Sequence, residues 1–279
     1  MSNTGRVWLI TGASSGFGRE IAQAALAAGD TVVATARRTA ALDELATANP
    51  GRAFATTLDV TDQPGIDRAV AGVIEQHGRI DVLVNNAGHG MVGAAEETTD
   101  SELRELMEVH FFGPAALTRA VLPHMRRQGS GAIVQLTSQG GQLAFAGVSA
   151  YCATKFALEG YSEALAQEVG PLGIDVLIVE PGAFRTRLFA GGLRESAVID
   201  AYDATVGPVR AMMSDGDGKQ PGDPAKAAAA ILTALDADPT PLRLPLGGDA
   251  VDALTAHADG VRAELSAWEK VSRDTAIED

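Results

Sequence analysis

Short runs of apolar residues alternate along this chain with segments in which apolar residues recur at every third or fourth position. Several runs are apolar almost throughout and rich in Val, Ile and Leu, as is typical of strands buried on both faces. Because a helical pattern separates each run from the next, we expect an α/β fold, a doubly wound parallel sheet of about seven strands with helices on both faces. The expected strands lie at residues 6–10, 31–36, 52–60, 79–88, 131–138, 173–182 and 241–247.

The helix expected to begin near Thr99 carries two unusual residues on or near its apolar stripe. Thr99 and Glu102 form a capping-box pattern at its start. His110 lies in the stripe, and Pro114 follows four residues later, where it offers no N–H to the His110 carbonyl and collides with it. We therefore expect the helix to be distorted near His110. The stripe comprises Leu103, Leu106, His110, Gly113, Leu117 and Val121.

Residues 187–223 interrupt the alternation of strands and helices. This stretch contains Gly, Ala and Met and is too long for an ordinary connection between a strand and a helix. The chain shows no repeat and no low-complexity linker. We therefore expect a single domain over residues 1–279, with a lid at about 187–223.

Composition narrows the classes of partner. The chain has 279 residues, of which 46% are hydrophobic, and a formal net charge of −14, which argues against nucleic acid and anionic membranes. No run reaches the roughly 18 uninterrupted apolar residues of a membrane-spanning helix, and the first residues show no signal-peptide pattern. The one cysteine suits a reducing compartment. The histidines show no metal-ligand spacing. We expect a cytoplasmic protein without a metal site.

The first strand leads into a glycine-rich loop, TGASSGFGRE. Glycines at such a turn let the backbone approach a pyrophosphate, which then binds the amides at the helix N-terminus. The spacing Gly-x-x-x-Gly-x-Gly differs from the commoner dinucleotide pattern, and three glycines can also serve only the turn itself. The candidate cofactor residues in this loop are Gly12, Ser14, Ser15, Gly16, Phe17 and Gly18.

The end of the second strand bears on the choice of cofactor. Enzymes that prefer NAD usually place an acidic residue here for the ribose 2′-hydroxyl. Ala36 is followed instead by Arg37 and Arg38, whose guanidinium groups suit the 2′-phosphate of NADP(H), although they can also be a solvated basic pair. We expect NADP(H), with Asp59 and Val60 flanking the adenine.

Three further residues form a candidate catalytic set. Ser138 ends the fifth strand, and Tyr151 and Lys155 follow as Tyr-x-x-x-Lys, a spacing that places phenol and ammonium on one helix face. A nearby cation, together with a positively charged nicotinamide, should lower the pKa of Tyr151. Tyr151 can then protonate the alkoxide formed on reduction of a carbonyl, while Ser138 hydrogen-bonds that oxygen.

Taken together, the chain resembles the short-chain dehydrogenase/reductase family, whose members have a Rossmann-type fold. The matching stretches are TGASSGFG, LDV, NNAG, the serine in QLTSQGG, YCATK and PGAFRT. The resemblance implies that Lys155 bonds the nicotinamide ribose as well as acting on Tyr151. It also implies that one loop borders the adenosine ribose and another holds the nicotinamide end. The residues concerned are Asn86, Ala87 and Gly88 in the first loop, and Pro181, Gly182, Phe184 and Thr186 in the second.

His110 occupies the position at which this family usually has a catalytic asparagine. The resemblance implies that the main-chain carbonyl of this residue holds a water that links the catalytic lysine to solvent. The distortion expected from Pro114 would preserve that carbonyl, with the imidazole as an additional hydrogen-bonding group. The alternative is a core histidine satisfied by one buried partner.

The sequence therefore predicts an NADP(H)-dependent reductase of ketones or aldehydes. Alternatives are an NAD-dependent dehydrogenase of alcohols or hydroxysteroids and a cofactor-sensing regulator, which would not need Ser138, Tyr151 and Lys155 together. Apolar residues in 139–148 and 187–223 favour a small, fairly apolar substrate. The resemblance also implies a homodimer or homotetramer, through stripes that contain Phe111, Phe112, Phe156 and Leu165 and that can equally belong to the core.

Overall fold

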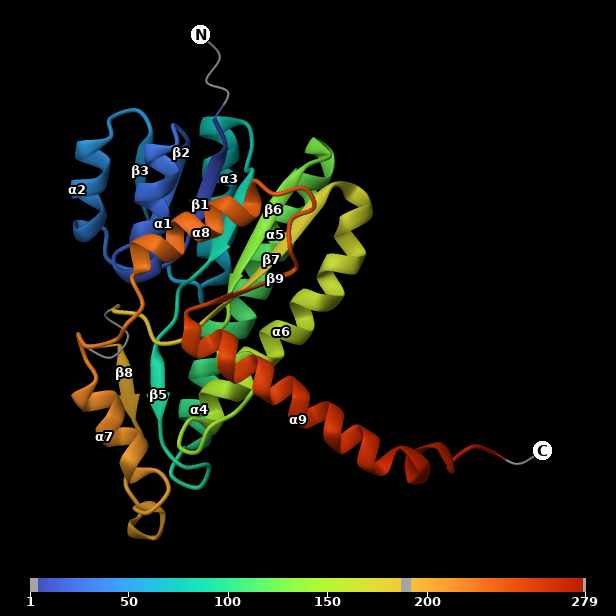
Figure 1. Ribbon diagram of the computed structural model, residues 1–279. Coiled ribbons are helices and arrows are strands. Elements are labelled where there is room, and N and C mark those ends of the chain that lie inside the picture. Colours follow the sequence, from blue (N-terminus) through green and yellow to red (C-terminus); the bar gives the residue numbers. More distant parts are fainter. Residues whose placement is uncertain (1–4, 187–191, 278–279) are drawn as a thin grey trace.

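The computed structural model describes residues 5–186 and 192–277. Figure 1 shows one parallel sheet between two layers of helices. The seven strands lie in the order β3-β2-β1-β4-β6-β7-β9, and every pairing between neighbours is parallel. All seven expected strands are present, so the predicted fold class is confirmed. Their bounds are Val7–Ile10, Thr31–Ala36, Ala53–Thr57, Val82–Asn85, Gly131–Leu136, Ile174–Pro181 and Arg243–Leu246.

The helices cover both faces because successive strand residues point to opposite sides of the sheet. Trp8 and Ile10 of β1 belong to the core cluster that packs under α1, α2 and α8. Val7 and Leu9 of the same strand belong to the cluster that packs under α3, α5 and α6. The bounds of these helices are Gly16–Ala27, Ala40–Ala48 and Pro224–Leu235 on the first face, and Gln63–His77, Gly113–Gln128 and Ser149–Val169 on the second.

A smaller unit lies beyond the carboxyl ends of the main strands. Strands β5 (Gly90–Val92) and β8 (Leu193–Glu195) form a two-stranded parallel sheet, with α7 (Gly207–Asp215) beside it (Figure 1). Helix α4 (Asp100–Met107) begins with the predicted capping box of Thr99 and Glu102. The sequence pattern indicated neither β5 nor β8. Residues 187–191 of the expected lid lie outside the described residues.

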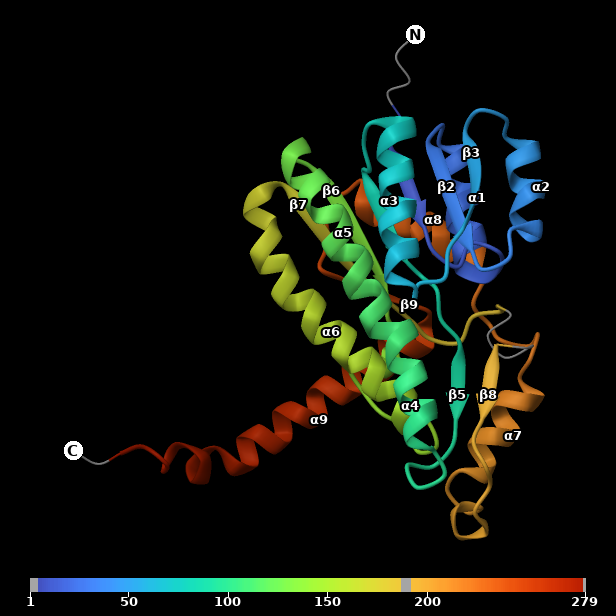
Figure 2. The ribbon, with the colours of Figure 1, turned by 180° about the vertical axis from the view of Figure 1, so that it is seen from behind.

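The last helix, α9 (Gly248–Arg273), leaves the body of the molecule and runs outward, as both views show (Figures 1 and 2). Ala250 in its first turn is its only buried residue. The apolar pattern of the strands did not indicate such a projecting helix, which we call the arm. Among the described residues, no helix combines the length and the apolar character needed to cross a membrane.

Thr11 fastens the glycine-rich loop to the end of β4. Its side chain is 1% exposed, and its hydroxyl accepts hydrogen bonds from the backbone N–H groups of Asn86 (2.9 Å) and Ala87 (3.1 Å). The same hydroxyl donates to the carbonyl of Val84 at 3.1 Å. The Asn86 side chain donates in return to the carbonyls of Thr11 and Gly12. Two neighbouring strand ends are thus held together at the edge where the site lies.

We expect Thr11→Val to lower the free energy of unfolding by about 2–3 kcal/mol, because two backbone N–H groups lose their acceptor while the side-chain shape is kept. Denaturant unfolding followed by circular dichroism measures this loss. The control is Thr57→Val, at an exposed position of the edge strand β3, with an expected change below about 0.5 kcal/mol. Equal effects of the two substitutions would contradict the role given to the Thr11 hydroxyl.

Candidate active site

Ser138, Tyr151 and Lys155 come together where β6 ends and α6 begins. The Ser138 hydroxyl accepts a hydrogen bond from the backbone N–H of Gly140 at 3.0 Å. Lys155 donates from Nζ to the carbonyl of Leu136 at 2.8 Å, and Nζ lies 5.6 Å from the centroid of the Tyr151 ring. A hydroxyl, a phenol and an ammonium thus converge from one strand end and one helix turn.

The protonation of Tyr151 depends on its burial. Burial raises the pKa of Tyr151 to about 12, and the hydrogen bond with Ser138 acts in the lowering direction. Burial also lowers the pKa of Lys155 to about 8. In the protein without cofactor the pKa of Tyr151 is therefore raised, because burial disfavours the phenolate, and the lowering expected with a positively charged nicotinamide bound stays a prediction. At neutral pH Tyr151 holds its proton.

His110 is 1% exposed and links two elements through both ring nitrogens. The backbone N–H of His89 donates to Nε2 at 3.1 Å, so Nε2 is unprotonated. The proton of the neutral ring is then on Nδ1, which lies 3.0 Å from the hydroxyl of Thr154. Thr154 in turn donates to the carbonyl of Tyr151 at 2.8 Å. The imidazole therefore ties the loop after β4 to the turn of α6 that carries the catalytic tyrosine.

Two further observations bear on the chemistry of His110. Burial first, then the positive charge of Lys155, place its pKa well below the usual 6.5. The ring stands edge-on to Tyr151, with 5.6 Å between the centroids. The neutral imidazole has two hydrogen-bonding partners, whereas the alternative considered was a core histidine with one buried partner.

The helix is distorted at His110, as expected. Residues Glu108–Phe112 form a π-helical turn between α4 and α5. Within it the N–H of Gly113 donates to the carbonyl of Glu108, five residues back, whereas an α-helix would use Val109. Pro114 then opens α5 without an N–H to offer to the His110 carbonyl.

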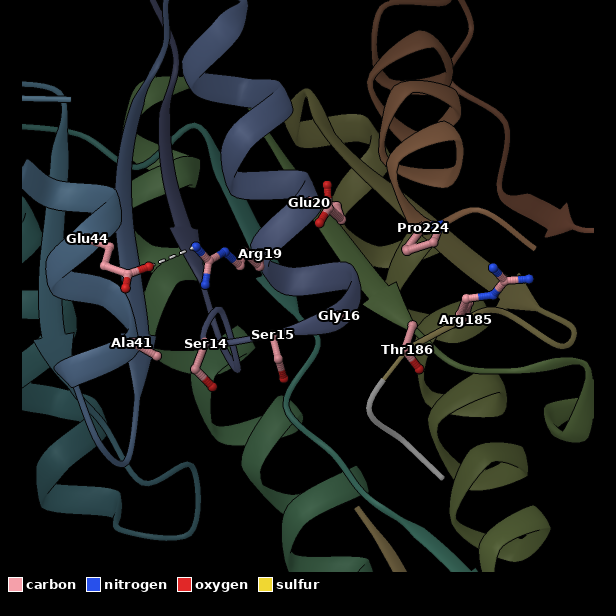
Figure 3. A pocket seen from close by; sticks show the side chains of 10 residues that line it. All are labelled: Ser14, Ser15, Gly16, Arg19, Glu20, Ala41, Glu44, Arg185, Thr186 and Pro224. Atoms are coloured by element: carbon pink, nitrogen blue, oxygen red, sulfur yellow. Dashed lines mark hydrogen bonds and ion pairs between the residues drawn. The ribbon is translucent and has the colours of Figure 1, made fainter. Parts of the chain in front are cut away.

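A pocket of about 590 Å³ lies at the start of α1, and Ser138, Tyr151 and Lys155 are not among the residues of its wall. Figure 3 shows Arg19 on one side, in an ion pair of 3.3 Å with Glu44, and Arg185 on the other. Backbone amides at a helix start, serine hydroxyls and guanidinium groups suit the phosphates of a dinucleotide. The pocket therefore fits the nucleotide part of such a cofactor. Residues in its wall include Ser14, Ser15, Gly16, Arg19, Arg185 and Thr186.

The backbone of the glycine-rich loop has the predicted close approach. Gly12 and Gly16 have φ angles of +65° and +54°, which residues with side chains rarely adopt. A Cβ atom on Gly18 would lie 2.6 Å from the carbonyl oxygen of Gly12. Phe17 packs on Phe184, with ring centroids 5.1 Å apart. Glycine is thus required at these positions by conformation and space.

The other predicted cofactor residues lie at the same edge of the sheet. Ala87 and Gly88 follow β4, and a Cβ on Gly88 would meet His110 Nε2 at 3.0 Å. Pro181 ends β7, and Gly182 donates from its N–H to the carbonyl of Leu246 at 2.9 Å. The next residue, Ala183, donates to the Asp249 carboxylate at 2.7 Å. Thr186 lines the pocket described above.

Arg37 and Arg38 are exposed just beyond β2 and outside the wall of this pocket. Within the described part of the chain, neither guanidinium is engaged in a salt bridge or a hydrogen bond. Asp59 and Val60 follow β3, the strand that pairs with β2. The hydrogen bond from the N–H of Thr61 is the main cause that lowers the pKa of Asp59. The charge of Arg37 also acts to lower the pKa of Asp59, and both guanidinium groups are exposed to solvent.

A buried acidic pair behind Lys155 escaped the sequence analysis. Glu159 of α6 is 4% exposed and Glu180 of β7 is fully buried, and both lie near Arg243 of β9. Burial raises the pKa of Glu159 to about 7 and also raises the pKa of Glu180. Gln142 donates to the Glu180 carboxylate. No local motif marks these residues, because the pair forms only when α6 packs on the sheet.

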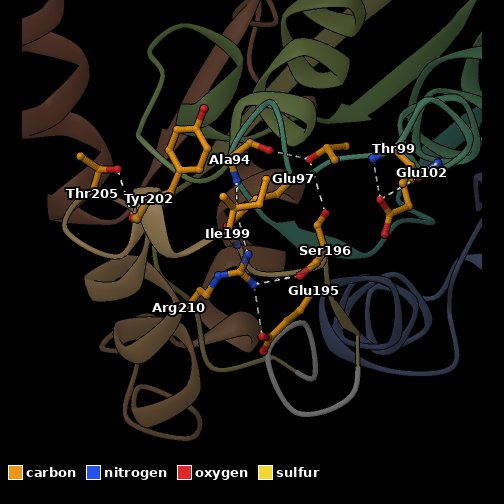
Figure 4. A network of polar contacts seen from close by, with 11 residues as sticks. Ala94, Glu97, Thr99, Glu102, Glu195, Ser196, Ile199, Tyr202, Thr205 and Arg210 are labelled. Carbon is orange, nitrogen blue, oxygen red and sulfur yellow. Dashed lines mark hydrogen bonds and ion pairs between the residues drawn. The ribbon is translucent and has the colours of Figure 1, made fainter.

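Ion pairs fasten the segment that includes α7 to the loop before α4 (Figure 4). The buried carboxylate of Glu97 accepts hydrogen bonds from the N–H groups of Ala94 (2.6 Å) and Ile199 (2.8 Å), and from Arg210 of α7 at 2.8 Å. Arg210 also pairs with Glu195 of β8 at 3.4 Å. The described part of the expected lid is thus held in place beside β5.

Several solved structures are similar to this chain in fold. A short-chain dehydrogenase from Streptomyces avermitilis is 63% identical, with a TM-score of 0.93, over 99% of this chain and 100% of that chain. An alcohol dehydrogenase from Thermococcus sibiricus, complexed with 5-hydroxy-NADP, is 26% identical (TM-score 0.71; 86% and 95% covered). A 3-ketoacyl-(acyl-carrier-protein) reductase from Brucella melitensis, complexed with NADH, is 27% identical (TM-score 0.76; 89% and 100% covered). Both cofactor types thus occur among similar folds.

Comparison of sequences also identifies oxidoreductases as relatives of this chain. The oxidoreductase BOA17 of Botryotinia fuckeliana (strain B05.10) is 38% identical over 272 residues, which cover 97% of this chain and 99% of the relative. The family model described as short chain dehydrogenase matches residues 6–195, the part that holds the glycine-rich loop and the serine, tyrosine and lysine. The chain therefore belongs to the short-chain dehydrogenase/reductase family of oxidoreductases.

Proposed function

We propose that the protein is an NADP(H)-dependent reductase that converts a ketone or aldehyde into an alcohol, reversibly. The observation that carries this proposal is the convergence of Tyr151 with Lys155 and Ser138, where burial raises the pKa of the phenol to about 12. A phenol that keeps its proton at neutral pH is ready to donate it, which is what the reduction of a carbonyl requires. The single buried thiol, Cys152, suits a cytoplasmic location.

Each residue of the set has one task. The nicotinamide cofactor, when bound, supplies the hydride for the carbonyl carbon. Tyr151 donates its proton to the substrate oxygen, and the Ser138 hydroxyl holds that oxygen by a hydrogen bond. Lys155 stabilises the phenolate that remains, because its ammonium lies beside the ring. Ser14, Ser15 and the amides at the start of α1 would hold the pyrophosphate of the cofactor.

The substrate proposed is small, uncharged and fairly apolar. Met91 and Val148 are buried near Tyr151, and Phe145 is 44% exposed in the loop before α6. Met213 packs with Val92 and Val206 in a small apolar cluster between β5 and α7. We propose that residues 192–223 and the loop 139–148 form the substrate walls, with the Glu97–Arg210 pair holding the lid.

A second candidate is an NAD-dependent dehydrogenase of alcohols or hydroxysteroids. It is favoured by the exposed position of Arg37 and Arg38, outside the wall of the nucleotide pocket. The Brucella neighbour, complexed with NADH, shows that the fold accommodates that cofactor as well. A cofactor-sensing regulator is less favoured because such a protein would not need Ser138, Tyr151 and Lys155 together.

Turnover with NADPH tests the main proposal. The purified protein should oxidise NADPH, followed by its absorbance, in the presence of some members of a panel of apolar ketones and aldehydes. Tyr151→Phe should lower kcat about 100-fold or more and leave NADPH binding nearly unchanged, because only the proton donor is lost. A variant that keeps more than about a hundredth of the wild-type kcat would contradict Tyr151 as the acid.

The choice of cofactor gives a separate prediction. NADPH should bind at least about tenfold tighter than NADH, a difference of roughly 1.4 kcal/mol, through Arg37 and Arg38 on the 2′-phosphate. Fluorescence titration measures both affinities. The double variant Arg37→Ala/Arg38→Ala should weaken NADPH binding and leave NADH binding unchanged. The proposal fails if the wild type binds the two cofactors equally.

His110 and Pro114 should differ in their effects on activity. His110→Asn should keep kcat within about tenfold of the wild type, whereas Pro114→Ala should be more damaging, because it restores an N–H that can recapture the His110 carbonyl. The pKa of His110 lies well below 6.5, so the ring is neutral above pH 6.5 and adds no step there to the pH–rate profile. A histidine-dependent step near pH 6.5, or lower activity of folded His110→Asn than of folded Pro114→Ala, would overturn this ranking.

A further inference from the structure

Helix α9 carries apolar side chains that the described residues of its own chain leave uncovered. The helix has 26 residues, and only Ala250 near its start is buried. Leu265, Trp268 and Val271 are each more than 60% exposed, and they belong to the C-terminal half of α9. That end of the helix runs furthest from the body (Figure 2). An isolated helix is marginally stable in water and gains most of its stability from packing of an apolar face. A helix of this kind requires a partner.

The apolar residues follow the spacing of a coiled coil. Six of them are separated alternately by three and four residues, which is the a and d pattern of three heptads. We call these residues the α9 seam: Val251, Leu254, Ala258, Val261, Leu265 and Trp268. Five are exposed and Leu254 is partly so. The seam therefore predicts a helical partner that lies nearly parallel or antiparallel to α9.

We propose that the partner is α9 of a second copy of this chain, packed antiparallel about a twofold axis. In one register every a position of the seam meets a d position of the other copy. Val251 then faces Trp268 of the second copy, Leu254 faces Leu265, and Ala258 faces Val261. Each layer is apolar, and Trp268 and Val261 each meet a smaller residue. A twofold axis requires this kind of self-complementary face.

The charges beside the seam favour the antiparallel orientation. In that register the flanking position His257 meets Glu264 of the second copy, and Thr255 meets Arg262. In a parallel, in-register pair Glu264 would instead meet Glu269 of the other copy, twice over by symmetry, and like charges there are unfavourable. Parallel arms would also bring both folded bodies to the same end of the pair.

The distribution of charge along the arm points the same way. Residues 248–260 contain Asp249, Asp252 and Asp259 but neither lysine nor arginine, a net charge of −3. Residues 261–273 contain Arg262, Lys270 and Arg273 against Glu264 and Glu269, a net charge of +1. Antiparallel arms place the acidic half of each against the more basic half of the other, which favours association of this orientation.

This contact is separate from the surface on α5 and α6 that the family resemblance suggested. Leu165, one of the residues considered there, is 3% exposed and belongs to the core, whereas Phe112 and Phe156 are 49% and 44% exposed. The alignment with the Streptomyces avermitilis structure covers 99% of this chain, so it includes nearly all of α9. The arm is therefore shared with a crystallised relative.

Substitution in the seam tests the contact. Leu265→Asp should halve the molar mass measured by light scattering at micromolar concentration, because a carboxylate enters an apolar layer in both halves of the pair. The matched control is Ser266→Asp, one residue later on an exposed position outside the seam, which should keep the wild-type mass. A monomeric wild type, or the same mass for Leu265→Asp as for the wild type, would overturn the proposal.

Cysteine cross-linking tests the orientation in the full-length protein. The native Cys152 is buried and does not interfere. Chains with Leu254→Cys, mixed with differently tagged chains with Leu265→Cys, should form a disulfide between the two kinds of chain on mild oxidation. Leu254→Cys alone should cross-link poorly, because in the antiparallel pair the two copies of this position lie eleven residues apart, about 16 Å along the helix. Efficient cross-linking of Leu254→Cys with itself indicates parallel arms, and absence of the mixed disulfide contradicts the register, so either result overturns the antiparallel pairing.

Discussion

The register between four parallel strands determines where the site is formed. Ile10, Val84, Val134 and Leu177 make one row across β1, β4, β6 and β7. Two to four residues after this row come the glycine-rich loop, the Asn86 loop, Ser138 and Pro181. A slip of one residue in any pair would turn its side chains to the opposite face of the sheet. Burial of both faces prevents such a slip, and Thr11 joins two of the loops directly.

The sequence predicts the seven main strands well, because a strand covered by helices on both sides must be apolar throughout and leaves a clear pattern. It predicts Tyr151 and Lys155 equally well, because their spacing is set by a single helix. Strands β5 and β8 have three residues each, too few for any period to be visible. The Glu159–Glu180 pair and the raised pKa of Tyr151 depend on packing between distant segments. No property of the linear chain reports the depth of that burial.

His110 joins two segments that lie far apart along the chain. Its neutral ring spans from the His89 N–H to Thr154, and the π-helical turn brings the ring to that place. A sequence pattern can indicate that the residue faces inward. It cannot supply the identity of the partners, since His89 and Thr154 lie 21 and 44 residues away along the chain.

The contact between Asp249 and the N–H of Ala183 joins the first turn of α9 to the loop that follows β7. A Cβ atom on Gly182 or Gly247 would collide with the Asp249 carboxylate, so the backbone packs closely around this side chain. The first turn of α9 and the loop after β7 are consequently in direct contact. Thermodynamic linkage is reciprocal, so if binding of a ligand at this loop depends on the position of α9, a contact that fixes α9 and that ligand must change each other's affinity by the same factor.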